Sequence, residues 1–337
     1  MTIDKIGNVN IPDITKIENI NSTDITYVNG IYVDFSIPPS GYTLGGYIGS
    51  GYVSTVEKVL FPFDSGTATL SGNLSVEMGP NGGCNSSQYG FNMGSDIVGG
   101  NASNIERIEF PFNSGTSSHV GNLSRSCSSG ASCNSSQHGF MLGGYSHPNY
   151  ISTIERITFP FNSGTASQVG TIGLNTRNLR GCNSSQHGFC FGGQASDFIS
   201  TIRRILFPHD SGTASNVGNI SKTNGSMVSC NSSQHGFCMG GNYPGTLFSI
   251  IERITFPFNS GTASNVGNLS TSRRSGAGVN STIYGYAIAG TDGSAMSSIE
   301  RITFPFNSGT ANNVGNLNQS KWNTAGVDNT DFVSMFV

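Results

Sequence analysis

A tract reading close to Phe-Pro-Phe-Asn-Ser-Gly occurs six times, and it constrains this chain more than any other feature. A repeat of 48 or 49 residues, built from short strands and turns, is typical of one blade of a β-propeller. We therefore predict an all-β protein with a single domain over residues 1–337. The six copies begin at Phe61, Phe110, Phe159, Phe207, Phe256 and Phe304.

Each repeat divides into four segments, A to D, that have strand character. Segment A ends in Cys-Asn-Ser-Ser-Gln, as at residues 181–186, and segment B is an aromatic-rich run closed by glycines, as at 187–193. Segment C corresponds to 152–159 and segment D to 165–170. Proline ends segment C because it cannot donate to a β-ladder, and the following glycine favours a turn. We expect four antiparallel strands in each blade.

The two ends of the chain favour seven blades, although six tracts also permit six. Residues 323–337 contain an A-like and a B-like segment, whereas Ile14–Ile17 and Thr26–Val28 within residues 1–30 resemble segments C and D. We expect these four segments to form one closing blade, which would leave no free sheet edge. Ile31–Val33 would then begin the six repeats of residues 31–322. Six blades are the alternative.

The composition argues against several classes of partner. Only 10% of the residues are charged and the net charge is −3, so no basic surface for nucleic acid is expected. No apolar run approaches the roughly 20 residues that span a bilayer. The N-terminal residues lack the apolar core of a signal peptide. We expect neither membrane insertion nor conventional export.

Two repeat positions carry residues that could be mistaken for a metal site. Cysteine alternates with valine at the first position, which indicates a small buried apolar site and free thiols. Histidine alternates with tyrosine at the second, which indicates an aromatic stacked at a turn, since residues related by rotation lie too far apart to share a metal. The positions are Cys84, Cys133, Cys182, Cys230, Val279 and Val327, and then His138, His187, His235, Tyr89 and Tyr284.

Segment C carries a repeated acidic and basic pair, such as Glu155 and Arg156. We expect these pairs to join successive blades, with the arginine of one blade near the glutamate of the next. Arg203 replaces the glutamate in one repeat and predicts an altered junction there. The Asn-Ser-Ser tracts match a glycosylation pattern, but their place between A and B favours a turn in which both residues bond locally to the backbone.

The apolar run closed by a glycine doublet, as at Gly143–Gly144 and Gly192–Gly193, is followed by a loop and a strand containing Ile-Glu, and in this it resembles the kelch repeat. The kelch tryptophan is missing from the repeats, and the only tryptophan is Trp322. The sequence motifs Ile-Glu-Arg-Ile, Ser-Gly-Thr-Ala and Gly-Asn-Leu-Ser are similar to those of kelch-like arrays in tail-fibre and other virion proteins of marine bacteriophages. This resemblance implies a virion protein made in the host cytoplasm, with other virion proteins as partners.

Variation between the copies indicates where binding would occur. The A–B and C–D connections are nearly constant, whereas the B–C and D–A connections differ in almost every copy, and these two kinds emerge at opposite ends of an up-and-down blade. Variable loops are where recognition surfaces are normally built. The candidate binding residues on them are aromatic or cationic: Tyr47, Tyr52, Tyr145, His147, Tyr150, Phe198, Tyr243, Phe248, Arg177, Arg180, Arg273, Arg274, Lys321 and Trp322.

No arrangement of nucleophile and base, and no pair of carboxylates, indicates a catalytic site. We therefore expect no enzyme activity, no cofactor and no metal. The leading hypothesis is a tail- or capsid-associated virion propeller that binds a host glycan, a receptor or another protein through its variable loops. A lectin-like or adhesion propeller of a cell is the alternative. An oxidoreductase of the galactose-oxidase kind is the weaker one, because the required Tyr/Cys/His set outside the repeat register is not evident.

Overall fold

The computed structural model describes residues 38–80 and 82–330, together with four two-residue strands before them. The chain divides into two compact units, residues 1–38 and 39–337, which are described separately. In the first unit, β1 (Lys16–Ile17) pairs with β2 (Ile20–Asn21), and β3 (Tyr27–Val28) pairs with β4 (Ile31–Tyr32).

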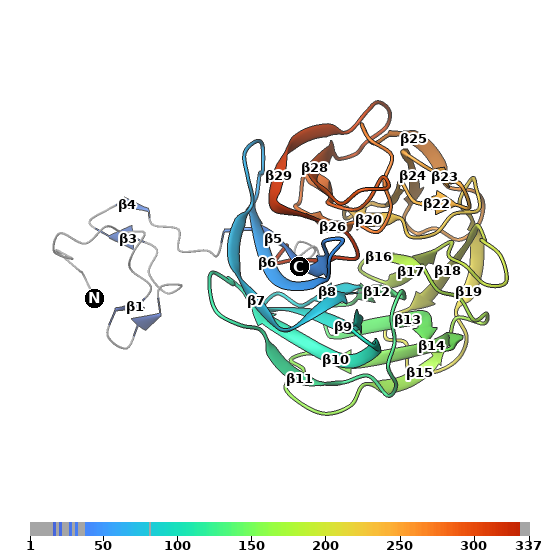
Figure 1. The fold of residues 1–337 in the computed structure, drawn as a ribbon, viewed down its shortest axis with the longest axis horizontal. Coiled ribbons are helices and arrows are strands. Elements are labelled where there is room, and N and C mark those ends of the chain that lie inside the picture. Colours follow the sequence, from blue (N-terminus) through green and yellow to red (C-terminus); the bar gives the residue numbers. More distant parts are fainter. Residues whose placement is uncertain are drawn as a thin grey trace. The chain divides into compact units, whose positions relative to one another are not determined.

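The second unit is a β-propeller arrangement of small antiparallel sheets around an axis (Figure 1). Four separate sheets have four strands each, and their strands follow one another along the chain. The first two sheets consist of β12 (Ala131–Asn134), β13 (His138–Ser146), β14 (Asn149–Thr158) and β15 (Ser167–Thr171), and of β16 (Arg180–Asn183), β17 (His187–Phe191), β18 (Thr201–Leu206) and β19 (Ser215–Asn219). The third sheet consists of β20 (Val228–Asn231), β21 (His235–Met239), β24 (Ile250–Thr255) and β25 (Ser264–Asn268). The fourth sheet consists of β26 (Ala277–Asn280), β27 (Tyr284–Ile288), β28 (Met296–Thr303) and β29 (Asn312–Lys321). A small ladder of β22 (Asn242–Tyr243) and β23 (Thr246–Leu247) lies in one B–C connection.

The remaining strands form an eight-stranded sheet that consists of two further four-stranded sets. One set is β30 (Ala325–Asp328), β5 (Ser40–Tyr47), β6 (Tyr52–Leu60) and β7 (Thr69–Pro80), and the other is β8 (Gly83–Asn85), β9 (Tyr89–Ile97), β10 (Gly100–Glu109) and β11 (Ser118–Asn122).

The two sets of this sheet are joined because β7 continues beyond β6 and pairs with β9 at Gly79. Elsewhere the same contact is an isolated bridge, as between Ser128 and Tyr145. The described residues therefore contain six four-stranded sets, and we call them blades one to six in the order of their B strands, β5, β9, β13, β17, β21 and β27.

The structure corrects the predicted use of the chain ends. Residues 325–328 pair with β5 and supply the innermost strand of blade one, the place that the sequence analysis gave to Ile31–Val33. Ile31 and Tyr32 pair with β3 instead. The A-like segment had been expected to pair with residues 332–337, which lie outside the described residues. The correction has a simple cause: segment A is short and similar in every repeat, so either end of the chain fits the pattern.

Successive blades meet through the same contacts all the way round, including the junction between blades six and one. The phenylalanine that precedes each proline stacks on an aromatic ring of the preceding blade, as Phe159 does on Phe91, with ring centroids 5.2 Å apart. Phe61 stacks in the same way on Tyr286 of blade six, at 5.1 Å. These rings exclude water from each junction and recur with the repeat, which explains the constancy of the tract.

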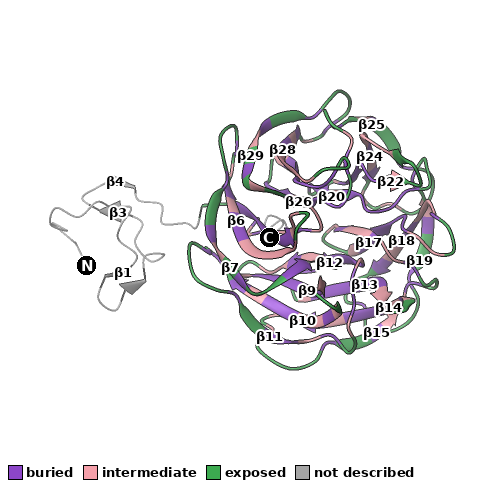
Figure 2. Ribbon diagram, in the orientation of Figure 1, coloured by how far each residue is buried: buried purple, intermediate pink, exposed green. Residues whose placement is uncertain are grey.

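The core lies between the blades, and the exposed residues gather on the outer strands and loops (Figure 2). The repeated cysteine or valine of segment A is buried at every junction and packs against a glycine of the next B strand, as Cys84 does against Gly139. All seven cysteines are buried, and none of them forms a disulfide. No helix among the described residues is long and apolar enough to cross a bilayer.

Candidate binding face and axial channel

The loops of the second unit form two contrasting faces. In each blade the neighbouring strands are antiparallel, so that A–B and C–D turns lie at one end and B–C and D–A connections at the other. The constant turns are held locally, because the hydroxyl of Ser135 accepts hydrogen bonds from the backbone N–H groups of Gln137 (3.3 Å) and His138 (3.0 Å). The equivalent serines repeat these contacts, which confirms the turn role of the Asn-Ser-Ser tract for its serine.

The variable face carries an aromatic cluster on blade three. The guanidinium of Arg177 lies 4.7 Å from the ring centroid of Tyr150 and 5.5 Å from that of Tyr145. The hydroxyl of Tyr145 lies 2.8 Å from Nδ1 of His147. Arg177 and both tyrosines are half-buried, and His147 is exposed. The structure thus brings together four of the residues that the sequence analysis proposed for binding.

Polar residues of blade two support this cluster, and sequence reasoning missed them. The amide of Asn101 donates to Oδ1 of Asp96 and to Oγ of Ser128, each at 2.9 Å. Its oxygen accepts from the backbone N–H of His147 at 3.1 Å. Burial raises the pKa of Asp96, while Ser128, Asn101 and the charge of Arg177 lower it in part. The position of these residues in variable loops was the one feature of the sequence that could have indicated their role.

An open groove of about 710 Å³ adjoins the cluster, between the loops of blades three and four. Tyr150 and the exposed Leu174 belong to its lining, and Asn149 and Asn175 add amide groups. Aromatic, aliphatic and amide surfaces side by side suit a ligand that has both apolar and hydroxyl faces. The other lining residues are Pro148, Ala195, Ser196 and Ile199.

A second aromatic group lies on blade one. The rings of Tyr47 and Trp322 are 4.8 Å apart, and those of Tyr47 and Tyr52 are 5.2 Å apart. Backbone hydrogen bonds in both directions join Tyr47 to Trp322, at 2.7 and 3.0 Å. Trp322 is half-buried. The tryptophan therefore helps to hold the chain end that completes blade one, besides contributing to the face.

The other predicted binding residues are scattered. Phe198 is buried and packs on the exposed Tyr243 at 5.8 Å, while Phe248 lies 5.4 Å from Nζ of Lys222. Arg274 is exposed on the D–A connection of blade five. None of these residues joins the blade-three cluster through a contact that the structure shows.

Arg273 and Lys321 are corrections to the predicted set. Both side chains are fully buried, with Arg273 bonded to Glu300 and Nζ of Lys321 lying 3.2 Å from Oε1 of Glu57. Burial lowers the pKa of each cation, and the neighbouring carboxylate raises it in part. These residues stabilise blade junctions and are not accessible at the surface. The part of a D–A connection that carries such a residue lies inside the contact between two blades, and the sequence of the connection does not show that it is buried there.

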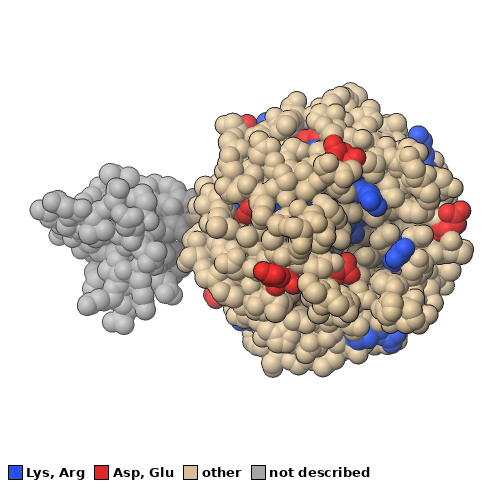
Figure 3. All heavy atoms as spheres, viewed as in Figure 1, with Lys and Arg blue, Asp and Glu red and all other residues tan. Residues whose placement is uncertain are grey.

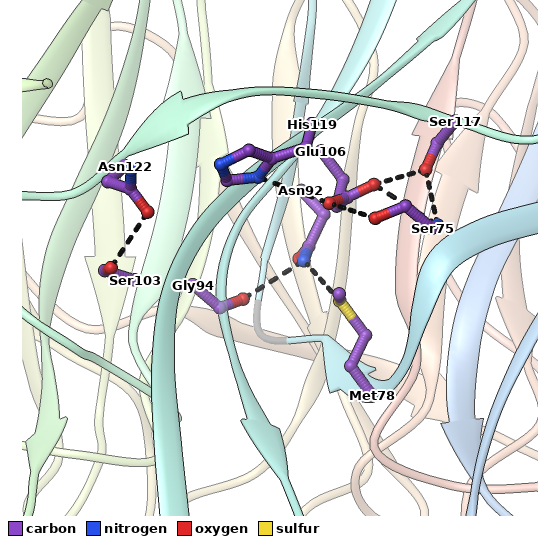
Figure 4. A network of polar contacts seen from close by, with 9 residues as sticks. All are labelled: Ser75, Met78, Asn92, Gly94, Ser103, Glu106, Ser117, His119 and Asn122. Atoms are coloured by element: carbon purple, nitrogen blue, oxygen red, sulfur yellow. Dashed lines mark hydrogen bonds and ion pairs between the residues drawn. The ribbon is translucent and has the colours of Figure 1, made fainter. Parts of the chain in front are cut away.

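The charged pairs of segment C join the blades, as expected, but by different contacts from those predicted. Each glutamate faces the preceding blade, but it does not contact the segment C arginine of that blade. Glu106 accepts hydrogen bonds from the backbone N–H (3.3 Å) and the hydroxyl (2.7 Å) of Ser75 in the preceding blade, and from the hydroxyl of Ser117 in its own blade (Figure 4). Oε1 of Glu106 also lies 3.5 Å from Nδ1 of His119. Each arginine reaches the next blade, as Arg107 does to the carbonyl of Phe161.

Arg203 marks an altered junction between blades three and four. It takes the place of the glutamate, is 6% exposed, and its Nη1 has no hydrogen-bond partner among the described residues. The serine that faces the glutamate at four other junctions is replaced by Gly173, whose φ is 80°. At this junction, therefore, the glutamate that accepts the hydrogen bonds and the serine that donates them are both replaced.

The repeated histidines pack against the next aromatic residue of their strand in a tilted and not a stacked arrangement, as His187 does against Phe189, with centroids 6.1 Å apart and ring planes at 49°. Burial, followed by the charge of Arg204, lowers the pKa of His187. No group of three or more His, Cys, Asp or Glu side chains suited to a metal lies in the described part of the chain.

A polar cavity of about 200 Å³ lies on the axis at the constant face. Asparagines of segment A ring it. The side-chain oxygens of Asn134, Asn183, Asn231 and Asn280 each accept a hydrogen bond from a backbone N–H of the preceding blade, as that of Asn183 does from Asn134 at 3.2 Å. The expectation of a local asparagine bond was therefore wrong. Asp328 replaces asparagine in blade one, and burial raises its pKa to about 7. Repeat alignment could have revealed this substitution.

Neither a known protein family nor a curated protein matches this chain. The functional conclusions below therefore depend on geometry and on the repeat pattern.

Proposed function

We propose that this protein is a non-enzymatic, six-bladed, kelch-like propeller that serves as a structural protein of a phage virion and binds a host surface glycan or a protein. Six equivalent junctions support the count of six over seven, since the parallel bridge between Thr67 and Asn316 joins blade six to blade one just as Asn122 and Thr165 join blades two and three. The proposed virion role depends only on the resemblance of the repeat motifs to those of phage virion proteins.

The cluster of Arg177 on Tyr145 and Tyr150 carries the binding role. Aromatic rings with a nearby guanidinium and amides form the kind of surface that anchors sugar faces and protein hot spots. Charged residues make up only 10% of the sequence and are sparse on the face drawn in Figure 3, so long-range electrostatic attraction contributes little. Recognition would then depend on close contact within the groove of blades three and four.

The polar clusters favour binding over catalysis. Both serines near Glu106 donate to the carboxylate, and His119 contacts the same carboxylate, so this histidine is not placed to activate a serine. Burial raises the pKa of Cys190 to about 11, which leaves its thiol a poor nucleophile.

A glycan array with matched variants tests the binding face. We expect Tyr150→Ala and Arg177→Gln each to weaken binding at least about tenfold, since each removes part of one stacked anchor. Arg274→Gln is the control, because Arg274 occupies the same repeat position as Arg177 and has no aromatic ring against it among the described residues. Equal binding by all four proteins, or none by the unmodified chain, would remove the glycan-binding role.

Mass spectrometry of purified phage particles tests the virion role separately. We expect the protein at a fixed copy number in particles. Its presence only in cell cytosol would favour the lectin-like alternative, even if the glycan array were positive.

A further inference from the structure

Five of the six blade junctions hold the D–A connection by the same hydrogen bond. The segment C glutamate of one blade is buried and accepts a hydrogen bond from a backbone N–H of the connection in the preceding blade, at 2.5 to 3.3 Å. This bond fixes the first residue of the connection to the next blade. The donors are Ser75, Ser124, Ser221, Ser270 and Asn318.

The junction between blades three and four lacks this bond. Gly173 has the position of the donor and Arg203 that of the acceptor, and a guanidinium cannot accept a hydrogen bond from an N–H group. The N–H of Gly173 donates instead to Oγ1 of Thr171 in its own blade, at 3.2 Å. In the described part of the chain, no hydrogen bond joins residues 173–175 to blade four.

The D–A connection of blade four is a matched comparison, because its ends are held in the same way. The N–H groups of Ile172 and Thr176 donate to carbonyls of β14, at 2.7 and 3.1 Å. Those of Ile220 and Asn224 donate to carbonyls of residues 199–200, at 2.7 and 3.2 Å. The two connections therefore differ in the hydrogen bond from the first residue to the next blade.

Gly173 can act as a hinge for the released connection. Its φ is 80°, in the left-handed region that glycine enters without steric cost, whereas none of the five donors at the other junctions has a positive φ. Glycine adopts negative φ as readily. The backbone at residue 173 can therefore change between these two regions while Ile172 and Thr176 stay in place.

This connection borders the groove between blades three and four. Leu174 and Asn175 line it together with Tyr150. Leu174 is 44% exposed, so a ligand under the connection would cover apolar surface. The amide of Asn175 offers both a donor and an acceptor to sugar hydroxyls. Among the described blades, the one junction without the glutamate bond is thus the junction that carries the groove.

We propose that residues 173–175 form a strap that closes over a glycan bound in this groove, with Gly173 as its hinge. The inference rests on the glycan-binding role proposed above and adds how the site adapts to its ligand. Arg203 is a positioning residue, because it replaces the carboxylate that would hold the strap against blade four.

Amide exchange of the full chain, followed by NMR, tests the released strap without a ligand. Relative to their intrinsic rates, we expect the N–H of Gly173 to exchange at least about tenfold faster than that of Ser221, which is bonded to the buried Glu252. Equal protection of the two amides would overturn the proposal. The double variant Gly173→Ser/Arg203→Glu copies the residues of four other junctions, so it should fold and protect residue 173 as Ser221 is protected.

The glycan array tests the closure. We expect the double variant to bind about tenfold more weakly than the unmodified chain, because the new hydrogen bond to a carboxylate holds the strap in place. Ser221→Gly/Glu252→Arg is the control: it removes the same bond one junction away, so amide 221 should exchange faster and glycan binding should not change.

Three array results would overturn the closure. They are unchanged binding by Gly173→Ser/Arg203→Glu, an equal loss of binding in both double variants, and no binding by the unmodified chain. The last result would also remove the glycan-binding role itself. A positive array with equal protection of the amides of Gly173 and Ser221 would overturn the strap alone.

Discussion

Nζ of Lys321 lies 3.2 Å from Oε1 of Glu57, and this ion pair joins the last described blade to the first. The two residues are 264 positions apart in the chain, and both side chains are buried. The carboxylate also accepts a hydrogen bond from the backbone N–H of Asn318, at 2.6 Å. One acidic side chain therefore holds two parts of blade six against blade one.

Lys321→Met should lower the free energy of unfolding by about 3 kcal/mol, because it leaves the Glu57 carboxylate buried without its cation. Urea denaturation followed by tryptophan fluorescence measures this change, since Trp322 is adjacent. Lys222→Met is the control, and its effect should be within about 0.5 kcal/mol because Lys222 is exposed. Similar values for both variants would show that the ion pair contributes little to ring closure.

Asp328→Asn should stabilise the protein at pH 8 and have little effect at pH 4. The pKa of Asp328 is raised from 3.8 to about 7 in the folded state, so the folded protein retains a proton that the unfolded chain loses between these values. Stability from this group therefore falls as pH rises from about 4 to 7, by at most about 4 kcal/mol. Denaturation curves of both proteins at several pH values give the difference. A stability difference between the two proteins that does not change with pH would contradict the raised pKa of Asp328.

The seven thiols should react with a thiol reagent only after unfolding. All are buried, and burial raises the pKa of Cys84 and Cys127 to about 12, which leaves almost no thiolate at pH 8. Absorbance after addition of Ellman's reagent should show almost no reaction in buffer and seven thiols in guanidinium chloride. A thiol that reacts within seconds in the native protein would be evidence against this packing.

Gly278→Ala should destabilise the fold by about 3 kcal/mol or more. Its added Cβ would overlap the backbone of Ser229 in the neighbouring blade, and the three nearest atoms are all backbone atoms of that residue, which leaves little room to adjust. Gly51→Ala is the matched control, since nothing lies within 4 Å of its added Cβ. Circular dichroism melts of the two variants measure the contrast. Equal Tm values would mean that the blades can separate at the axis without cost.

Some of the candidate site could be predicted from sequence because loop variation shows which face is free to change. Tyr145, Tyr150 and Arg177 were proposed on that ground, and the structure brings them into one cluster. Arg273 stands in an equally variable loop but is buried against Glu300. Arg177 and Arg273 lie at neighbouring repeat positions, and a shift of one residue along an extended chain reverses the direction of the side chain.

The sequence by itself determined the blade, because a repeat with alternating apolar residues, a proline and a glycine turn can bury its apolar face only against another copy of itself. The tertiary structure decided how the ring closes and where the charges go. Closure places residues 325–328 on β5, since short strands of similar sequence compete for one edge and only the complete ring selects between them. The ion pair of Lys321 with Glu57 has the same origin, because its two residues belong to different blades and no single repeat contains both.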